Sequence, residues 1–496
     1  MPYMSVAAID AAVDHIIATY PAIAQAVALP EASVEGRAIK AFRIAHGGGV
    51  QRTGVLFLGG SHARELINPE TLISLALRLC AAYSANTGLA FGPKTYAAAS
   101  IQSIVNGLDI FVLPMVNPDG RNFCLVPGGD AMWRKNRSNH PGNACRGVDI
   151  NRNYDFLWPS GIGTSSDSCT DIYKGPGAFS EPETRNVRWM IDSFTNVACM
   201  VDVHSYSELV LYPWGDDENQ SSDPNQNFRN PAFDGQRGIV GSGYKEYIPA
   251  ADLHAHVTTA DRIRDGIAAV RGRVYTVEES ISLYPTTATA HDYAYARNFI
   301  DTGRRRILGF TLETARAFQP PDAEKDSVIS EVSAGLMECL LETLCPAEVV
   351  QALLGALLPL AALRSLRDRT MLTTAAGRRY EQLFRRNSLE LVTLVSTSKT
   401  ALAAGASFIG VVGRLVSAPS STRKIAVADL SEAASALKVF QKLGSKALKA
   451  DMAATQKDLV GLKGLTLQGA FKRLSKAATP SRAPVKKAAA KRKTRA

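Results

Sequence analysis

Apolar positions in the first two thirds of the chain follow two alternating patterns. Residues 53–60 (TGVLFLGG) and 108–114 (LDIFVLP) are almost continuously apolar, which is typical of strands covered on both faces. Similar runs predict further strands at residues 39–46, 198–206 and 307–314. Apolar residues repeated every three or four positions predict helices at residues 69–83, 183–194 and 259–270. This alternation predicts an α/β layered fold in which the strand ends hold the functional site.

The pattern changes after the break QPPD at residues 319–322. Residues 324–478 predict one helix after another, rich in Ala, Leu and Lys, with breaks near residue 346 and at residues 417–421. No second α/β pattern follows. We therefore expect an α/β domain at residues 1–320, a helical region at 323–422, a basic helical region at 423–478 and a disordered basic tail at 479–496.

Positive charge is concentrated at the C-terminal end. Residues 423–496 contain 18 lysines and arginines against 4 acidic residues, so the remaining chain must be slightly acidic although the whole carries +10. The end is expected to be either a solvated helical appendage or a module that binds nucleic acid, anionic lipid or cell-wall polymer. Phe440 and Phe471 are the only aromatic residues after 430, so any nucleic-acid contact should be with phosphates and not sequence-specific.

Neither a secretory signal nor a membrane span is apparent. The first twenty residues lack a basic start and place Asp10 and Asp14 within their apolar periodicity, which predicts an amphipathic helix. The longest apolar stretches, residues 349–363 and 401–413, are too short for a conventional span and are expected to be buried helices. A cytoplasmic location is therefore the default expectation.

His62 and Glu65 lie three residues apart directly after a predicted strand. They could be a polar patch where the strand ends, or two ligands of a metal site, since positions i and i+3 share one side of a helical turn. A hydrolytic zinc site needs three protein ligands and an open position. His204, near the end of another predicted strand, could be the third ligand.

Other metal motifs are weaker or missing. His254 and His256 are a rival ligand pair, in a polar segment (residues 215–256) that we interpret as an inserted loop. No H-E-x-x-H motif is present, which excludes that kind of protease site. The seven cysteines include no C-x-x-C pair, which argues against a structural zinc site.

Several ordered elements resemble the zinc carboxypeptidase A family over about residues 18–316. They include GGSHARE (59–65), MVNPDG (115–120), WRKNR (133–137), GVDINRNYDF (147–156), DVHSYSE (202–208), LYPTTATAHDYAY (283–295) and FTLET (310–314). The resemblance implies a mixed central β-sheet flanked by helices. It also implies an exopeptidase that uses one Zn²⁺ ion to hydrolyse the C-terminal peptide bond of peptides and proteins.

The resemblance implies roles for individual residues of the chemical centre. It makes His62, Glu65 and His204 the zinc ligands, and Glu313 the general base and acid that moves a proton from water to the leaving amine. It also makes Arg137 the donor that polarises the scissile carbonyl and stabilises the oxyanion.

The resemblance further implies how substrate is bound. Asn151 and Arg152 would hold the terminal carboxylate, for which the guanidinium fork is suited, and Tyr284 would cover it. Arg64 and Arg134 would line the cleft as auxiliary positive positions.

Two departures leave specificity and compartment open. His291 occupies the floor position of the specificity pocket, where it would be neutral at neutral pH and could gain charge in acid, and Tyr293 replaces the usual tryptophan. Polar or acidic C-terminal residues are one guess at the preference. Cys145 and Cys169 match a disulfide of secreted relatives, which would imply an oxidising compartment, or are two reduced cysteines.

Two other functions compete with the peptidase. A related zinc amidohydrolase acting on N-acyl amino acids or cell-wall peptides would share H-x-x-E and the fold. A non-catalytic binding protein on the same fold is expected to lose a ligand or the glutamate, whereas all three ligands, Arg137 and Glu313 are present.

Overall fold

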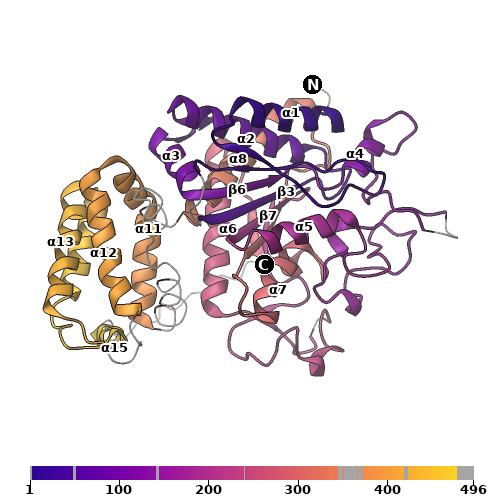
Figure 1. Cartoon of the computed structure of the whole chain (residues 1–496). Helices are drawn as coiled ribbons and strands as arrows, with labels where there is room; N and C mark the ends of the chain where they lie inside the picture. The colour runs from indigo at the N-terminus through magenta and orange to yellow at the C-terminus, as the bar shows by residue number, and fades with distance from the viewer. Residues whose placement is uncertain are drawn as a thin grey trace, which may run out of the picture. The chain divides into compact units, whose positions relative to one another are not determined.

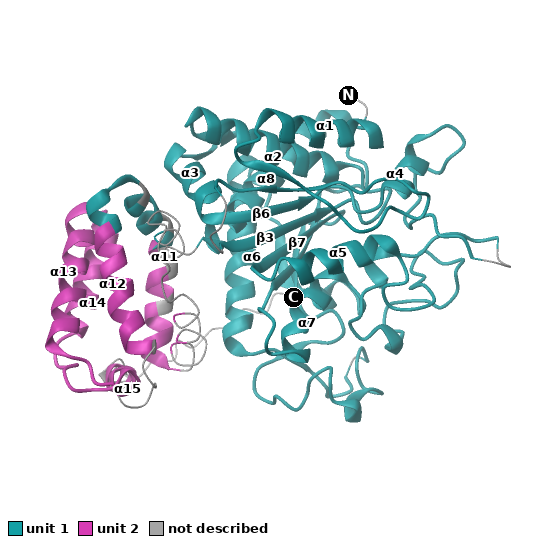
Figure 2. Cartoon of the chain, viewed as in Figure 1, with its two compact units in different colours: residues 1–356, 388–402 teal, residues 357–387, 403–496 magenta. Residues whose placement is uncertain are grey.

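The computed structural model describes residues 3–47, 52–140, 144–239, 241–344, most of 374–417 and 423–477, and isolated positions between 350 and 371 (Figure 1). The chain forms two compact units (Figure 2). The first contains residues 1–356 and 388–402, and the second contains residues 357–387 and 403–496. The predicted basic tail and almost all of the predicted helix at 349–363 lie outside the described residues.

The first unit is built around an eight-stranded mixed sheet. In spatial order its strands are β1 (Ala24–Val27), β2 (Ala41–Ile44), β6 (Leu108–Leu113), β3 (Thr53–Gly59), β7 (Val197–Ser205), β12 (Leu308–Thr314), β8 (Leu209–Tyr212) and β11 (Thr276–Glu279). The central strands β6, β3, β7 and β12 are parallel, whereas β12 and β8 are antiparallel, as are β1, β2 and β6. The mixed central sheet implied by the resemblance is confirmed.

Helices cover both faces of this sheet, with α2 and α8 on one side and α5 and α7 on the other (Figure 1). The helices of this unit are α1 (Val6–Thr19), α2 (Ile67–Ala85), α3 (Ala98–Gly107), α4 (Pro118–Leu125), α5 (Pro182–Ser193), α6 (Ala250–Arg271), α7 (Ala290–Ile300) and α8 (Asp322–Thr343). Every residue of β3 is buried, because its alternating side chains meet a helical layer on either face. Leu56 and Leu58 belong to the core cluster that includes Met190 of α5 and Ala294 of α7.

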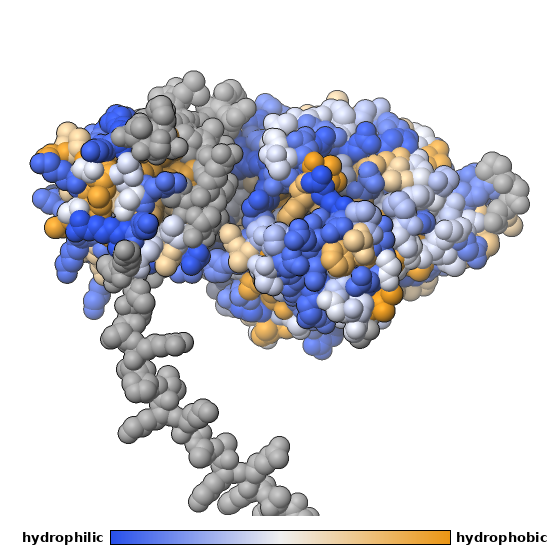
Figure 3. All heavy atoms as spheres, turned by 90° about the horizontal axis from the view of Figure 1, so that it is seen from below, coloured by the Kyte–Doolittle hydropathy of each residue, from blue (hydrophilic) through white to orange (hydrophobic). Residues whose placement is uncertain are grey.

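Short elements complete the unit. They are the hairpin of β4 (Leu89–Phe91) and β5 (Lys94–Tyr96), the parallel pair β9 (Asn219–Gln220) and β10 (Glu246–Tyr247), and the 3₁₀ turns η1 (Ile150–Arg152), η2 (Trp158–Ser160), η3 (Pro231–Phe233) and η4 (Ser280–Ser282). On the face drawn in Figure 3, apolar residues of this unit appear in small patches between hydrophilic ones, as expected for a domain with an internal core.

Helix α8 packs on α6 within the first unit, although the sequence assigns residues from 323 onward to a separate helical region. Two glycines allow this close contact. A Cβ at Gly266 would lie 2.8 Å from the carbonyl oxygen of Ala334, and a Cβ at Gly335 would lie 2.8 Å from Ile267 Cγ1. The predicted boundaries at residues 422 and 478 stay predictions.

The described part of the second unit is helical, as expected. Its helices are α13 (Val427–Leu443), α14 (Lys446–Asp458) and α15 (Leu467–Ala477), with most of α11 (Ala375–Thr397) and α12 (Lys399–Ser417). Residues 399–416 of α12 have a mean hydropathy of 1.3, enough by length and composition to cross a membrane. Val411 and Leu415 of this helix are nevertheless buried in a cluster with Ile425 and Leu462. Because core helices meet the same criterion, it is weak evidence of a membrane span.

Cys145 and Cys169 are joined in a disulfide. Disulfides persist in extracellular and other oxidising environments and are rare in the cytosol. The bond therefore favours an oxidising compartment, and the default expectation of a cytoplasmic location is not supported.

Candidate metal centre

The carboxyl ends of three neighbouring parallel strands bring the predicted site residues to one edge of the sheet. β7 lies between β3 and β12. His62 and Glu65 follow the end of β3, while His204 belongs to β7. Glu313 of β12 is the direct register partner of His204, so both side chains project from the same face. Residues more than a hundred positions apart in the sequence thus meet because their strands are parallel neighbours.

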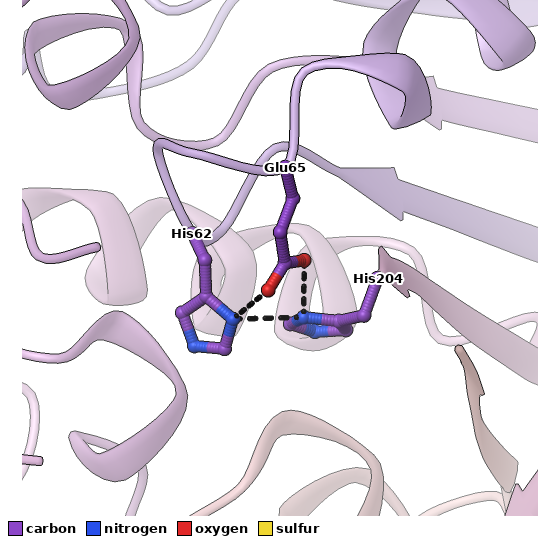
Figure 4. Close-up of side chains that lie close together, drawn as sticks. All are labelled: His62, Glu65 and His204. Carbon is purple, nitrogen blue, oxygen red and sulfur yellow. Dashed lines mark hydrogen bonds and ion pairs between the residues drawn. The ribbon is translucent and has the colours of Figure 1, made fainter. Parts of the chain in front are cut away.

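His62, Glu65 and His204 form a compact cluster (Figure 4). His62 Nδ1 lies 2.7 Å from Glu65 Oε1, and His204 Nδ1 lies 3.0 Å from Glu65 Oε2. The two Nδ1 atoms are 3.1 Å apart. All three residues are buried, and one ligand atom from each lies within 4.8 Å of the others. Two imidazole nitrogens and a carboxylate facing one another are a typical zinc ligand set.

The spacing of these atoms fits a zinc ion. Tetrahedral coordination at the usual zinc–nitrogen and zinc–oxygen bond lengths separates neighbouring ligand atoms by roughly 3.3 Å. The closest observed separations are 2.7, 3.0 and 3.1 Å, so small outward shifts would admit the ion. Two facing Nδ1 atoms cannot both be unprotonated acceptors without a donor between them, whereas a cation would satisfy both lone pairs.

A carboxylate lies behind each histidine ring. Asp149 Oδ1 is 3.0 Å from His62 Nε2, and Asp202 Oδ2 is 2.9 Å from His204 Nε2. Such partners fix the ring orientation of metal-binding histidines. Neither aspartate was among the site residues predicted from the sequence. The available signal was position: Asp149 stands two residues before Asn151, and Asp202 stands two residues before His204 on the same face of β7.

The ionisation of the cluster reflects these contacts. Burial opposes the charged form of Glu65, but the adjacent imidazoles of His62 and His204 outweigh it and lower the pKa of Glu65. Burial likewise opposes the charge on Asp149, yet the Arg134 guanidinium holds the pKa of Asp149 well below its usual range. The ligand carboxylate and the carboxylate behind His62 are therefore both anionic, which favours a cation at the cluster.

Glu313 has the opposite shift. Burial in a site that also contains the carboxylates of Glu65 and Asp202 raises the pKa of Glu313 to about 8, although His204 and Arg134 partly oppose the rise. The residue remains partly exposed, so solvent can reach it. A carboxylate with a pKa near neutrality can both accept and return a proton under working conditions.

Asn151, Arg152 and Tyr284 lie together beside the cluster. Both Asn151 and Arg152 belong to η1, and Asn151 Nδ2 is 3.5 Å from His204 Nε2. Arg152 Nη2 donates a hydrogen bond of 3.4 Å to the Tyr284 hydroxyl. Tyr284 is 46% exposed, and its ring centroid lies 5.8 Å from the Arg152 guanidinium carbon. The structure thus brings together the three residues predicted to bind a terminal carboxylate.

The two arginines of WRKNR lie in different surroundings from those that the sequence predicts. Arg137, the predicted oxyanion donor, stacks over the rings of Phe123 and Trp133 and pairs with Glu35 at 3.7 Å. None of its contacts among the described residues involves the cluster. Arg134, predicted to be auxiliary, is buried and donates from Nε and Nη2 to Asp149 Oδ2 at 3.0 and 2.8 Å. It is Arg134 that faces the cluster through Asp149, because the loop turns the two side chains in different directions.

Comparison with known proteins identifies the family. The sequence matches the zinc carboxypeptidase family over residues 9–334. The chain belongs to the zinc carboxypeptidase family. Its relatives include carboxypeptidase A4 of Mus musculus, 34% identical over 213 residues (43% of this chain and 47% of the relative), and carboxypeptidase B of Helicoverpa zea, 37% identical over 225 residues (44% and 48%). The chain spans about half the length of these curated relatives.

Two solved structures share the fold of the first unit. The crystal structure of thrombin activatable fibrinolysis inhibitor aligns with a TM-score of 0.54 at 21% identity, covering 68% of this chain and 73% of that one. The carboxypeptidase A from Helicoverpa armigera aligns with a TM-score of 0.53 at 24% identity, covering 68% and 72%. The one zinc ion typical of this family suits the His62, Glu65 and His204 cluster.

In this zinc carboxypeptidase family member, His291 is enclosed by protein. Its Nδ1 lies 3.0 Å from Thr311 Oγ1 and its Nε2 lies 3.4 Å from Asp292 Oδ1. Burial lowers the pKa of His291 to about 3, and the nearby His204 adds to the shift. The ring is therefore neutral at neutral pH and in mild acid, which restricts the gain of charge that the sequence suggested to strongly acidic conditions. Thr311 lies two residues before Glu313 on the same face of β12, so His291 does lie beside the site.

The remaining predicted residues lie outside the cluster. Arg64 stacks on Phe318 and pairs with Asp171 at 3.1 Å. His254 and His256 belong to α6, which begins at Ala250 where the sequence predicts a loop. His254 is exposed, whereas His256 is buried against Tyr295 and Phe310. The rival ligand pair is not brought together with any third ligand among the described residues.

Proposed function

We propose that this protein is a zinc-dependent carboxypeptidase that removes residues from the C-termini of peptides and proteins. The observation that supports it best is the combination of the zinc-fitting cluster with Glu313 in register beside it and a carboxylate-binding group, Asn151, Arg152 and Tyr284, a few ångströms away. Such a site recognises a chain end, whereas an endopeptidase needs no receptor for a terminal carboxylate.

Bound zinc would supply Lewis acidity for hydrolysis. His62, Glu65 and His204 would hold it, and the chain's own residues would do the rest. Arg152 forms charge-assisted hydrogen bonds with the terminal carboxylate of the substrate, and Asn151 donates its amide to the same group. Tyr284, exposed at present, closes over them and excludes water. This arrangement orients the last peptide bond toward the cluster and Glu313.

Glu313 moves the protons of the reaction. Its carboxylate takes a proton from the attacking water and gives it to the nitrogen of the leaving residue, so that the carbon–nitrogen bond breaks to an amine and a carboxylate. Arg134, rather than Arg137, is the arginine that we assign to the developing negative charge on the carbonyl oxygen. Its burial and its contact with Asp149 support this assignment, because both hold the guanidinium next to the cluster.

A mass-resolved peptide assay tests the function. The full chain is loaded with zinc and incubated with peptides that differ only in the last residue. We expect stepwise loss of C-terminal residues, which stops on chelation and returns with zinc. Glu313→Gln should keep zinc and lower turnover by roughly 100–10,000-fold. Glu218→Gln, at an exposed glutamate paired with Lys245, is the matched control and should leave turnover unchanged.

The same assay separates the competing functions. Hydrolysis of N-acyl amino acids or cell-wall peptides without trimming of peptides would favour the amidohydrolase. Zinc binding without hydrolysis of any of these would favour a binding protein on this fold. Unchanged turnover in Glu313→Gln would contradict the assigned mechanism.

Two further parts of the proposal concern the setting of the enzyme. The Cys145–Cys169 disulfide supports action outside the cell, on extracellular peptides.

The 18 positive charges of residues 423–496 support contact with an anionic polymer or membrane surface. Salt-dependent co-sedimentation of the full chain with anionic vesicles, lost on deletion of residues 479–496, tests the contact. Equal sedimentation of the deleted chain would contradict a role for the tail.

A further inference from the structure

The side chain of Asp202 has one strong partner, the metal-cluster residue His204. Both lie on β7 two positions apart, so both project from the same face of the strand. Asp202 is 0% exposed, and its Oδ2 is 2.9 Å from His204 Nε2. Ser61 Oγ also lies 3.3 Å from Asp202 Oδ1 and 3.4 Å from Asp202 Oδ2, and both distances are long for hydrogen bonds.

Asp202 has fewer strong partners than Asp149, the aspartate that contacts the ring of His62. Asp149 accepts two hydrogen bonds from Arg134 and one from the backbone nitrogen of Asn151. Among the described residues, by contrast, Asp202 forms no ion pair with a lysine or arginine. A buried carboxylate without a cation is unfavourable in a fold. A cation bound through His204 would compensate the charge of Asp202.

The contacts of His204 favour one tautomer of its neutral ring. A neutral imidazole has a single N–H. When that N–H donates to Asp202 from Nε2, the lone pair of His204 is left on Nδ1, the atom that faces His62 and Glu65. The other polar atom near His204 Nε2 is Asn151 Nδ2, at 3.5 Å. An amide nitrogen donates hydrogen bonds and cannot accept one from Nε2.

We propose that Asp202 is a positioning residue, which fixes the His204 ring and its tautomer so that Nδ1 is presented to zinc, and which thereby strengthens zinc binding. The inference rests on the zinc-binding part of the proposed function and not on the choice of substrate. Loss of such a partner typically weakens metal affinity by roughly 10–100-fold.

Zinc competition with a chromogenic chelator tests this directly on the full chain. Asp202→Asn retains the size of the side chain and removes the charge, and we expect zinc affinity to fall by roughly 10–100-fold. Asp109→Asn is the matched control, because Asp109 is also a buried aspartate of the central sheet but pairs with Arg43. Its zinc affinity should equal that of the unaltered protein. At saturating zinc, hydrolysis by Asp202→Asn should recover to within about tenfold of the unaltered protein.

A spectroscopic readout does not depend on whether the variant folds. In the zinc-loaded, unaltered protein with ¹⁵N-labelled histidine, we expect His204 to show a protonated Nε2 in a hydrogen bond. A protonated Nδ1 on His204 would overturn the proposal. So would zinc affinity within about threefold of normal in folded Asp202→Asn, or an equal loss in Asp109→Asn.

The outcomes separate this inference from the proposed function. Failure to trim any peptide, with zinc affinity that depends on Asp202, would overturn the peptidase and keep the positioning role. Failure of the unaltered chain to bind zinc would overturn both.

Discussion

At the scale of single residues, the structure brings some of the predicted side chains to the metal cluster and leaves others away from it. The spacing of His62 and Glu65 and the place of His204 at a strand end left a polar patch and a metal site both open; the family resemblance decided for the metal site, and the three side chains do cluster. Asp149 and Asp202 were not predicted, because the sequence alone does not show that these two carboxylates face the rings of His62 and His204. Arg134 and Arg137 show the same limit, because the hydrophobic periodicity of the sequence does not indicate which arginine of a loop faces the site.

The arginine pair gives a prediction with its own control. Arg134→Ala should lower turnover by roughly 100–1,000-fold, because the donor beside the cluster is lost. Arg137→Ala should leave turnover near normal and cost about 1 kcal/mol of stability, since it removes a cation that stacks on Phe123 and Trp133. Steady-state kinetics and denaturant unfolding measure the two effects. A larger loss of turnover in Arg137→Ala would restore the role predicted from the sequence.

Two buried histidines, His256 and His291, predict that the folded state loses stability in acid. Burial lowers the pKa of His256 and of His291 to about 3, below the value of about 6.5 in an unfolded chain. The unfolded state therefore binds more protons, so their contribution to stability is complete above pH 6.5 and is lost as pH falls toward 3. Each contributes a slope of up to about 1.4 kcal/mol per pH unit in this window.

Unfolding free energies at several pH values between 7 and 5 measure that slope. We expect His256→Phe, whose ring would lie among Tyr295 and Phe310, to show a shallower loss of stability in acid than the unaltered protein. Identical slopes would show that His256 is not held neutral in the folded state.

At the scale of elements, apolar runs predicted the central strands closely, because a strand covered on both faces has a simple signature. No end of β3, β6, β7 or β12 differs from its predicted position by more than one residue. Helix α6 begins nine residues before the predicted helix, because its first turns, which follow Pro249, contain Asp252, His254 and His256 and were interpreted as part of a polar loop. The packing of α8 on α6 depends on contacts distant in sequence, which no local pattern reveals.

The close packing of α6 on α8 predicts that a methyl group added at Gly266 destabilises the fold. Gly266→Ala would place a Cβ 2.6 Å from Glu338 Cγ and 2.8 Å from the carbonyl oxygen of Ala334, so α6 and α8 must move apart. We expect a loss of about 1–3 kcal/mol in unfolding free energy. Gly235→Ala, where a Cβ has nothing within 4 Å, should be neutral or slightly stabilising. Equal effects of the two substitutions would contradict the close contact of these helices.

At the scale of the whole molecule, the first unit explains the proposed function by itself. Its parallel strands bring the three candidate zinc ligands and the proposed general base, Glu313, to one edge of the sheet. The turn η1 and Tyr284 place the proposed carboxylate receptor beside them. The second unit is helical, and residues 423–496 have a local excess of positive charge. The predicted helical character of the C-terminal region is confirmed, whereas only the fold assigns α8 to the first unit.

The central claim is that the site recognises a free chain end next to a zinc centre. The most direct test compares one peptide in two forms, with a free C-terminal carboxylate and with a C-terminal amide, incubated with the zinc-loaded full chain and read by mass. We predict that the free acid loses its last residue and that the amide is cleaved at least about 100-fold more slowly, because Arg152 then lacks its anionic partner. Equal cleavage of both forms, or cleavage at internal bonds, would contradict the account.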